Sequence, residues 1–352
     1  MDTDQKTIIG RSYEKTKLGS SFDSQRSEFI VVYGRRRIGK TYLIRNFFLN
    51  KPCFYFQVTG IQKASAKIQL AEFSKEISRV FYGPGIKLET PKNWMAAFEL
   101  LTNTLSRPDL QKDPQKKIVL FFDELPWMAK RSSQVVSALE YYWNKFWVNQ
   151  NQIKLVVCGS AASWMIQHVI KDKGGLHNRL TLRLPMEAFN LQETQEYLNF
   201  MGIRYNTYQT LQIYMALGGV SYYLSLLNKT LSATQNINEL CFQKKGILLD
   251  EFSILFASLF NESQIYEDLV TLIASKTYGI ERSLIEQKLK LKGGMLSKKL
   301  KDLEQVGFIA SYQPWDRSKK GLSYKIIDEY LMFYLSWIAP TAEHRIRGQF
   351  SP

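Results

Sequence analysis

A glycine-rich stretch near the N-terminus has the residue types and spacing of a phosphate-binding loop. Two glycines five positions apart are followed by Lys40 and Thr41, in the order GRRRIGKTY. The glycines let the backbone wrap around phosphates, the lysine reaches the β- and γ-phosphates, and the threonine hydroxyl binds Mg²⁺. The loop follows an apolar run and precedes helical spacing, as the motif requires. The predicted nucleotide contacts are Gly34, Arg35, Arg36, Arg37, Ile38, Gly39, Lys40, Thr41 and Tyr42.

A second apolar run, Ile118–Phe122, ends in Asp123 and Glu124. Acids at the C-terminal end of a buried strand form a Walker B motif, in which Asp123 holds Mg²⁺ through water and Glu124 polarises the attacking water as general base. Such a run is a weak signal alone, but it is strong when a phosphate loop lies roughly eighty residues upstream. The chain lacks the Asn/Thr-Lys-x-Asp motif that reads guanine, so ATP is favoured over GTP.

Five runs predict the strands of a parallel sheet. Four of them are mostly apolar, as expected of strands buried on both faces, and TLRLP supplies the fifth. The run between the two motif strands indicates the ATPase branch with an added strand, rather than the nucleotide kinases and GTPases. Helical spacing over 132–150 carries an aromatic stripe that is better explained as core or domain interface than as a base-stacking platform. The five runs are Phe29–Tyr33, Cys53–Val58, Ile118–Phe122, Ile153–Cys158 and Thr181–Pro185.

The sequence resembles the AAA+/STAND-type P-loop ATPases, in particular the prokaryotic, archaeal-type ATPases with a C-terminal winged helix. The matching stretches are IIGR at 8–11, the glycine loop, LFFDELPW, CGSAASWM, KGGLHNR and LGGVSYYL, which together span most of the chain. The resemblance implies an α/β fold with a parallel sheet of order 5-1-4-3-2, an all-α lid and a winged helix-turn-helix domain. The expected parts are an ATPase domain at 1–188, a lid at 189–262, a winged helix at 263–340 and a tail at 341–352.

The same resemblance assigns further residues. Gly10 and Arg11 would lie near the adenine, and Ser160 would sit beside the γ-phosphate as the sensor 1 residue. Arg179 would be an arginine finger that acts in trans, which implies a homo-oligomer or a protein partner; the alternative is an ordinary surface or salt-bridged arginine. Two departures weaken the match, since Ser160 replaces the common Asn or Thr and Val220-Ser221 replaces the lid's x-Pro.

The C-terminal part is strongly basic. The chain has a formal net charge of +15, and residues 282–325 hold eleven Lys or Arg against four Asp or Glu. Three lysines are expected to point away from the leucine face of a helix, and three cations lie in the predicted wing, so duplex DNA is a candidate partner. The alternative is a basic face that contacts the ATPase part or a protein. The six residues are Lys298, Lys299, Lys301, Arg317, Lys319 and Lys320.

The three consecutive arginines of the loop need an explanation, because three adjacent side chains cannot converge on one anion. One is expected to face the nucleotide or a carboxylate and the others a neighbouring domain, subunit or polyanion; local salt bridges are the alternative.

The three cysteines form no CxxC pair, and no signal peptide or bilayer-spanning stretch is evident, which fits a cytoplasmic protein. We therefore predict an ATP- and Mg²⁺-dependent switch or motor, with an ATP-gated DNA- or protein-binding regulator of little turnover as the alternative.

Overall fold

The computed structural model describes residues 7–111, 113, 116–129, 133–170, 179–313 and 321–341. The chain forms two compact units. The first comprises Met1–Gly34 and Lys40–Met186, and the second comprises Arg35–Gly39 and Glu187–Pro352. Five residues of the glycine loop thus belong with the C-terminal unit, although the chain on either side of them belongs to the N-terminal unit.

The first unit is built on a five-stranded parallel sheet with the order β2-β3-β4-β1-β5. This arrangement confirms the predicted order and the P-loop α/β class. Every residue of β3 and β4 is buried, as expected for a parallel sheet that is covered on both faces. The strands are β1 Glu28–Tyr33, β2 Cys53–Thr59, β3 Lys117–Asp123, β4 Ile153–Gly159 and β5 Leu182–Pro185.

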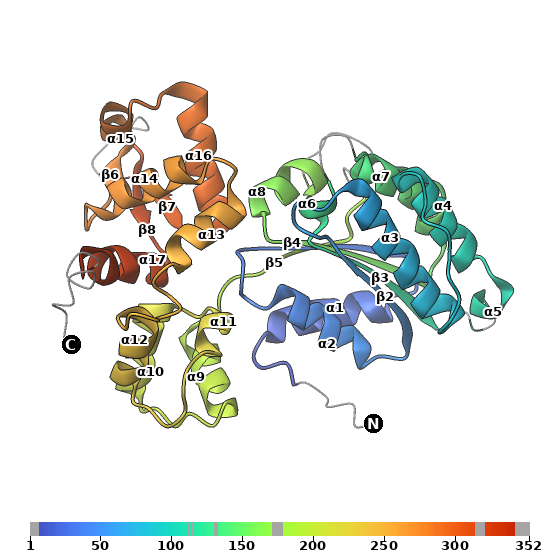
Figure 1. Cartoon of the computed structure of the whole chain (residues 1–352), viewed down its shortest axis with the longest axis horizontal. Helices are drawn as coiled ribbons and strands as arrows, with labels where there is room; N and C mark the ends of the chain where they lie inside the picture. The colour runs from blue at the N-terminus through green and yellow to red at the C-terminus, as the bar shows by residue number, and fades with distance from the viewer. Residues whose placement is uncertain are drawn as a thin grey trace. The chain divides into compact units, whose positions relative to one another are not determined.

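Helices cover both faces of this sheet (Figure 1). On one face lie α1 Ser12–Asp23 and α2 Lys40–Leu49. The ring centroids of Phe22 on α1 and Phe48 on α2 are 6.0 Å apart. The other face carries the larger apolar cluster, under α3 Ala66–Ile77, α4 Trp94–Leu105 and α7 Val135–Lys145. The aromatic stripe of α7 is buried in this cluster, which confirms its reading as core. The shorter elements are η1 Ser78–Tyr82, α5 Pro108–Gln111, α6 Leu125–Met128, η2 Trp147–Asn149, α8 Ala162–Met165 and η3 Ile166–Ile170.

The second unit begins with short helices whose start points are set locally. The expected capping box at Asn190 and Glu193 is present, and Asn206 and Ser232 form two more, so α9, α10 and α12 each begin where a side chain satisfies a free backbone N–H. These helices are α9 Leu191–Phe200, α10 Thr207–Leu217, α11 Ser221–Leu224, α12 Ala233–Cys241 and α13 Glu251–Leu259.

The rest of this unit combines helices with a three-stranded antiparallel sheet of order β6-β8-β7. Its leucine face is buried as expected, through Leu296, Leu300 and Leu303. The winged-helix assignment and the boundary at 262/263 stay predictions. None of the helices in the described ranges is long and apolar enough to cross a membrane. The elements are α14 Ser263–Ala274, β6 Ile280–Glu281, α15 Arg282–Leu289, α16 Gly293–Val306, β7 Ile309–Tyr312, β8 Ser323–Ile326, α17 Glu329–Phe333, η4 Tyr334–Ile338 and η5 Ala339–Thr341.

Candidate functional site

The glycine loop follows the C-terminal end of β1 and leads directly into α2. Its backbone has positive φ at Gly34 (153°), Arg37 (70°) and Gly39 (87°), which gives the chain the curvature that a phosphate cradle needs. The buried Lys40 amine donates to the Gly34 carbonyl at 3.0 Å, so the lysine side chain folds back along the loop. Because α2 begins at Lys40, the backbone N–H groups of its first turn add partial positive charge beside the lysine.

The threonine of the loop contacts the first acid at the end of β3. Thr41 Oγ1 lies 3.0 Å from each carboxylate oxygen of Asp123, which is 2% exposed. Burial raises the pKa of the Asp123 carboxyl to about 6, helped by the negative charge of Glu124 and opposed by the Thr41 hydrogen bond. A hydroxyl and a carboxylate form the oxygen donor set that Mg²⁺ prefers, so these two side chains fit the ion predicted for them.

The second acid is held by the end of the neighbouring strand. One carboxylate oxygen of Glu124 accepts hydrogen bonds from the Ser160 backbone N–H at 3.1 Å and from its hydroxyl at 2.9 Å. Glu124 has a left-handed backbone (φ 48°), an unfavourable conformation for a residue with a Cβ. The structure therefore brings Ser160 and Glu124 together, whereas contact of Ser160 with a γ-phosphate stays a prediction.

The predicted adenine-side residues lie at the start of α1. Gly10 and Arg11 both have positive φ (59° and 55°), and the buried Arg11 guanidinium donates to Glu14 at 3.3 Å. The Tyr42 hydroxyl donates to the Thr7 carbonyl at 3.2 Å, which ties the N-terminal stretch to the first turn of α2. The structure thus links this stretch to the glycine loop, and its role at the base stays a prediction.

Gly60, which the sequence analysis did not predict as a site residue, contacts the backbone of Asp123 and Glu124. Gly60 follows β2, and its N–H donates to the Asp123 carbonyl at 2.8 Å. A Cβ at this position would lie 2.5 Å from the backbone oxygen of Glu124. Only the missing side chain lets the backbone approach this closely, so a single glycine directly after an apolar run was the available signal.

The six basic residues predicted to contact DNA differ in exposure, and three of them lie outside the described residues. Lys298 and Lys301 are exposed on α16. Lys299 is only 4% exposed; its amine donates to Glu262 at 2.6 Å and lies 4.6 Å from the centre of the Tyr266 ring. The expectation that Lys299 points away with its neighbours is therefore wrong, because an acid and an aromatic ring compensate its burial. The predicted wing residues Arg317, Lys319 and Lys320 lie outside the described residues.

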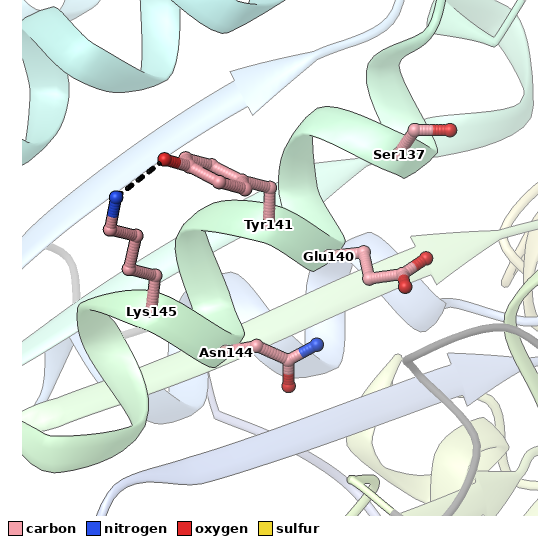
Figure 2. A pocket seen from close by; sticks show the side chains of 5 residues that line it. All are labelled: Ser137, Glu140, Tyr141, Asn144 and Lys145. Carbon is pink, nitrogen blue, oxygen red and sulfur yellow. Dashed lines mark hydrogen bonds between the residues drawn. The ribbon is translucent and has the colours of Figure 1, made fainter.

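Two other features come from segments other than the glycine loop and the acidic pair. Arg179 is exposed shortly before β5, and its role as an arginine finger stays a prediction. A shallow hollow on α7 is lined by Ser137, Glu140, Tyr141, Asn144 and Lys145, all from one helix (Figure 2). The Lys145 amine donates to the Tyr141 hydroxyl at 2.8 Å, which fixes that side of the hollow. None of its lining residues belongs to the glycine loop or the acidic pair.

Comparisons with known proteins agree with this geometry. Residues 9–227 match the family described as "ATPase domain predominantly from Archaea". An uncharacterised protein of Methanocaldococcus jannaschii, MJECL04, is 27% identical over 347 residues, which are 97% of this chain and 71% of that protein.

Two solved structures share the fold. A Walker-type ATPase of Pyrococcus abyssi, PABY2304, aligns with a TM-score of 0.64 and 17% identity, over 94% of this chain and 96% of the other. The ORC2 protein of Aeropyrum pernix, solved as ADPNP–ADP complexes, aligns with a TM-score of 0.54 and 14% identity over 97% of each chain. The family match spans more than half of the sequence and includes the glycine loop, the acidic pair and Ser160. This chain therefore belongs to the family of P-loop ATPase domains found predominantly in Archaea.

Proposed function

We propose that this ATPase is an ATP- and Mg²⁺-dependent switch or motor whose nucleotide is held by residues 34–42, with Gly10 and Arg11 on the side of the base. The observation that carries the proposal is the pair of 3.0 Å contacts between Thr41 and Asp123. They join the loop to the end of β3, so the groups for phosphate and metal binding meet at the carboxyl edge of the sheet. Ligands bind at this edge in open parallel sheets.

In this proposal each side chain of the site has a separate role in hydrolysis. Lys40 and the backbone N–H groups of the loop would neutralise phosphate oxygens, and Thr41 and Asp123 would hold Mg²⁺. Mg²⁺, when bound, adds positive charge where phosphate charge develops. Glu124 accepts the proton of the attacking water, and Ser160 fixes the orientation of the Glu124 carboxylate.

The contacts of Glu124 also support the second candidate, a regulator with little turnover. Both hydrogen bonds from Ser160 reach the same carboxylate oxygen, so in this conformation the base is partly engaged before any water arrives. A partner that breaks these bonds would release the base, and the protein would bind ATP long before it hydrolyses it. The two candidates therefore differ in basal turnover and share the same nucleotide site.

The remaining parts of the proposal concern partners. We infer that 189–262 form a lid and 263–340 a winged helix, and that exposed Lys298 and Lys301 contact the phosphates of duplex DNA. Arg179 would complete the site of a neighbouring subunit. We also propose a cytoplasmic location, which the odd number and wide spacing of the three cysteines support.

The decisive experiment compares binding and turnover in two site variants. Glu124→Gln should bind Mg-ATP with near wild-type affinity and lose hydrolysis by about 10²-fold or more, because the metal ligand remains while the base is lost. Lys40→Ala should lose both, since the phosphates lose the lysine charge. Glu72→Gln, an exposed change on α3, is the control. Near-normal hydrolysis by Glu124→Gln, measured as phosphate release, would exclude it as the base, and basal wild-type turnover separates switch or motor from regulator.

A further inference from the structure

Two of the three loop arginines form ion pairs with acids of the C-terminal unit. Arg35 pairs with Asp328, and the two side chains are 6% and 3% exposed. Arg37 pairs with Glu251, with exposures of 24% and 2%. Removing one member of a buried ion pair strands the other charge in a poorly solvated place, so these pairs constrain the loop far more than surface pairs do.

The backbone at Arg37 is held by the same unit. The Arg37 carbonyl accepts hydrogen bonds from the Tyr222 N–H and from the Ser221 hydroxyl, both at 3.2 Å. The guanidinium lies 4.6 Å from the centre of the Tyr222 ring. These contacts hold Arg37 at a φ of 70°, which disfavours residues with a Cβ. The loop therefore has an arginine at a backbone conformation that glycine would adopt without strain. The contacts of Arg37 with the C-terminal unit stabilise this strained conformation.

The two acids are themselves fixed. Glu251 accepts a second hydrogen bond from the Tyr223 hydroxyl at 2.7 Å. Asp328 accepts one from the Leu331 N–H at 2.9 Å and so caps the start of α17. Each acid thus connects a loop arginine to a helix of the C-terminal unit, and the positions of these helices and of residues 35–39 depend on one another.

We propose that Glu251 and Asp328 are positioning residues of the nucleotide site, which act through Arg37 and Arg35 to hold the phosphate loop in its curved conformation. This inference rests on the proposal that residues 34–42 hold the phosphates. Coupling between sites is reciprocal, so nucleotide binding biases α13 and α17 by the same free energy with which these helices bias nucleotide binding. The loop arginines are thus the connection through which the C-terminal unit senses nucleotide.

The test uses variants that remove charge and keep the local hydrogen bonds. Glu251→Gln retains an acceptor for Tyr223, and Asp328→Asn retains a helix cap. Each should weaken ADP and Mg-ATP binding to a similar degree, by about 5- to 150-fold, the usual range of coupling between sites. Glu286→Gln, which breaks the half-buried pair with Arg282 on α15, should leave both affinities unchanged. Thermal unfolding of every variant shows whether the fold survives.

Two further comparisons separate positioning from a plain structural role. If Arg37 acts through Glu251, the double variant Arg37→Ala/Glu251→Gln should bind no more weakly than the worse single variant, whereas independent effects would add. Arg37→Gly should bind more tightly than Arg37→Ala, because glycine adopts the positive φ without the tether.

The outcomes are distinct. Additive losses, or wild-type affinity in Glu251→Gln and Asp328→Asn while Lys40→Ala loses binding, would overturn this inference and leave the proposed site intact. Unchanged binding in Lys40→Ala would instead overturn the site itself. Hydrogen exchange at α13, which Glu251 begins, provides the reciprocal measurement: ADP should slow it in the wild type and have a smaller effect in Glu251→Gln. An equal effect of ADP in both proteins would contradict the coupling.

Discussion

The substitution Gly60→Ala tests whether the backbone position of Glu124 governs catalysis. The added Cβ would lie 2.5 Å from the Glu124 carbonyl oxygen, 3.1 Å from Trp127 Cβ and 3.2 Å from Met128 Cγ. Ordinary contacts of a Cβ begin at 3.4 Å, so the first of these pairs must separate by about 0.9 Å. The obstructing atom belongs to the backbone of Glu124, the proposed general base, and no side-chain rotation relieves the clash.

The size of the effect follows from that displacement. Overpacking of this kind costs about 1–3 kcal/mol of stability, which a large, well-packed unit tolerates. A misplacement of about 1 Å at a reacting group lowers the rate by roughly 10²-fold. Since Lys40 and the loop are not touched, Mg-ATP affinity should change far less than turnover.

The assay measures steady-state phosphate release, Mg-ATP affinity by calorimetry and the unfolding temperature on one preparation. Gly294→Ala is the matched control, because a Cβ there meets nothing within 4 Å and the residue lies in α16. We expect a large loss of kcat for Gly60→Ala, modest destabilisation and no loss for the control. A folded Gly60→Ala protein with wild-type kcat would refute the argument that Glu124 needs this backbone position.

Two further predictions concern charge. Burial, together with nearby Lys117, lowers the pKa of Lys154 from 10.5 to about 8. Between these pH values the unfolded chain binds more protons, so stability should rise with pH by up to about 3 kcal/mol, and Lys154→Met should remove this rise in urea unfolding. For DNA, Lys298→Gln/Lys301→Gln should reduce the slope of log affinity against log salt by about 1.8, and the exposed control Lys244→Gln/Lys245→Gln should not. Equal slopes would favour a protein-contact role.

The parts of the fold that were predicted correctly depend on neighbouring residues in the chain. The central strands β1, β3 and β4 are buried almost throughout and read as nearly unbroken apolar runs, and the partly exposed edge strands β2 and β5 were recognised from shorter apolar patterns. The capping box at Asn190 and Glu193 and the strand–loop–helix context of Lys40 also span only a few positions. Each of these patterns is complete within one short segment, so it can be recognised without knowing the tertiary contacts of the rest of the chain.

The features that escaped prediction depend on residues distant in sequence. Arg35 and Asp328 are 293 positions apart, and Arg37 and Glu251 are 214 apart, so no local spacing could pair them. Lys299 looked like one member of an exposed basic face, but an acid 37 positions upstream compensates its burial. The sequence raised the question of the three arginines, and the tertiary pairing answers it for two of them.

The strand order also determines when the sheet becomes complete during synthesis. β1 is made first, yet its neighbours are β4 and β5, and Glu28 pairs in register with Lys154. The apolar strand that carries the glycine loop therefore leaves the ribosome long before either neighbour exists. Pairing over such a distance in sequence is slow, and an unpaired apolar strand is prone to aggregate. The segment 28–33 therefore stays an unpaired apolar strand until β4 and β5 have been made.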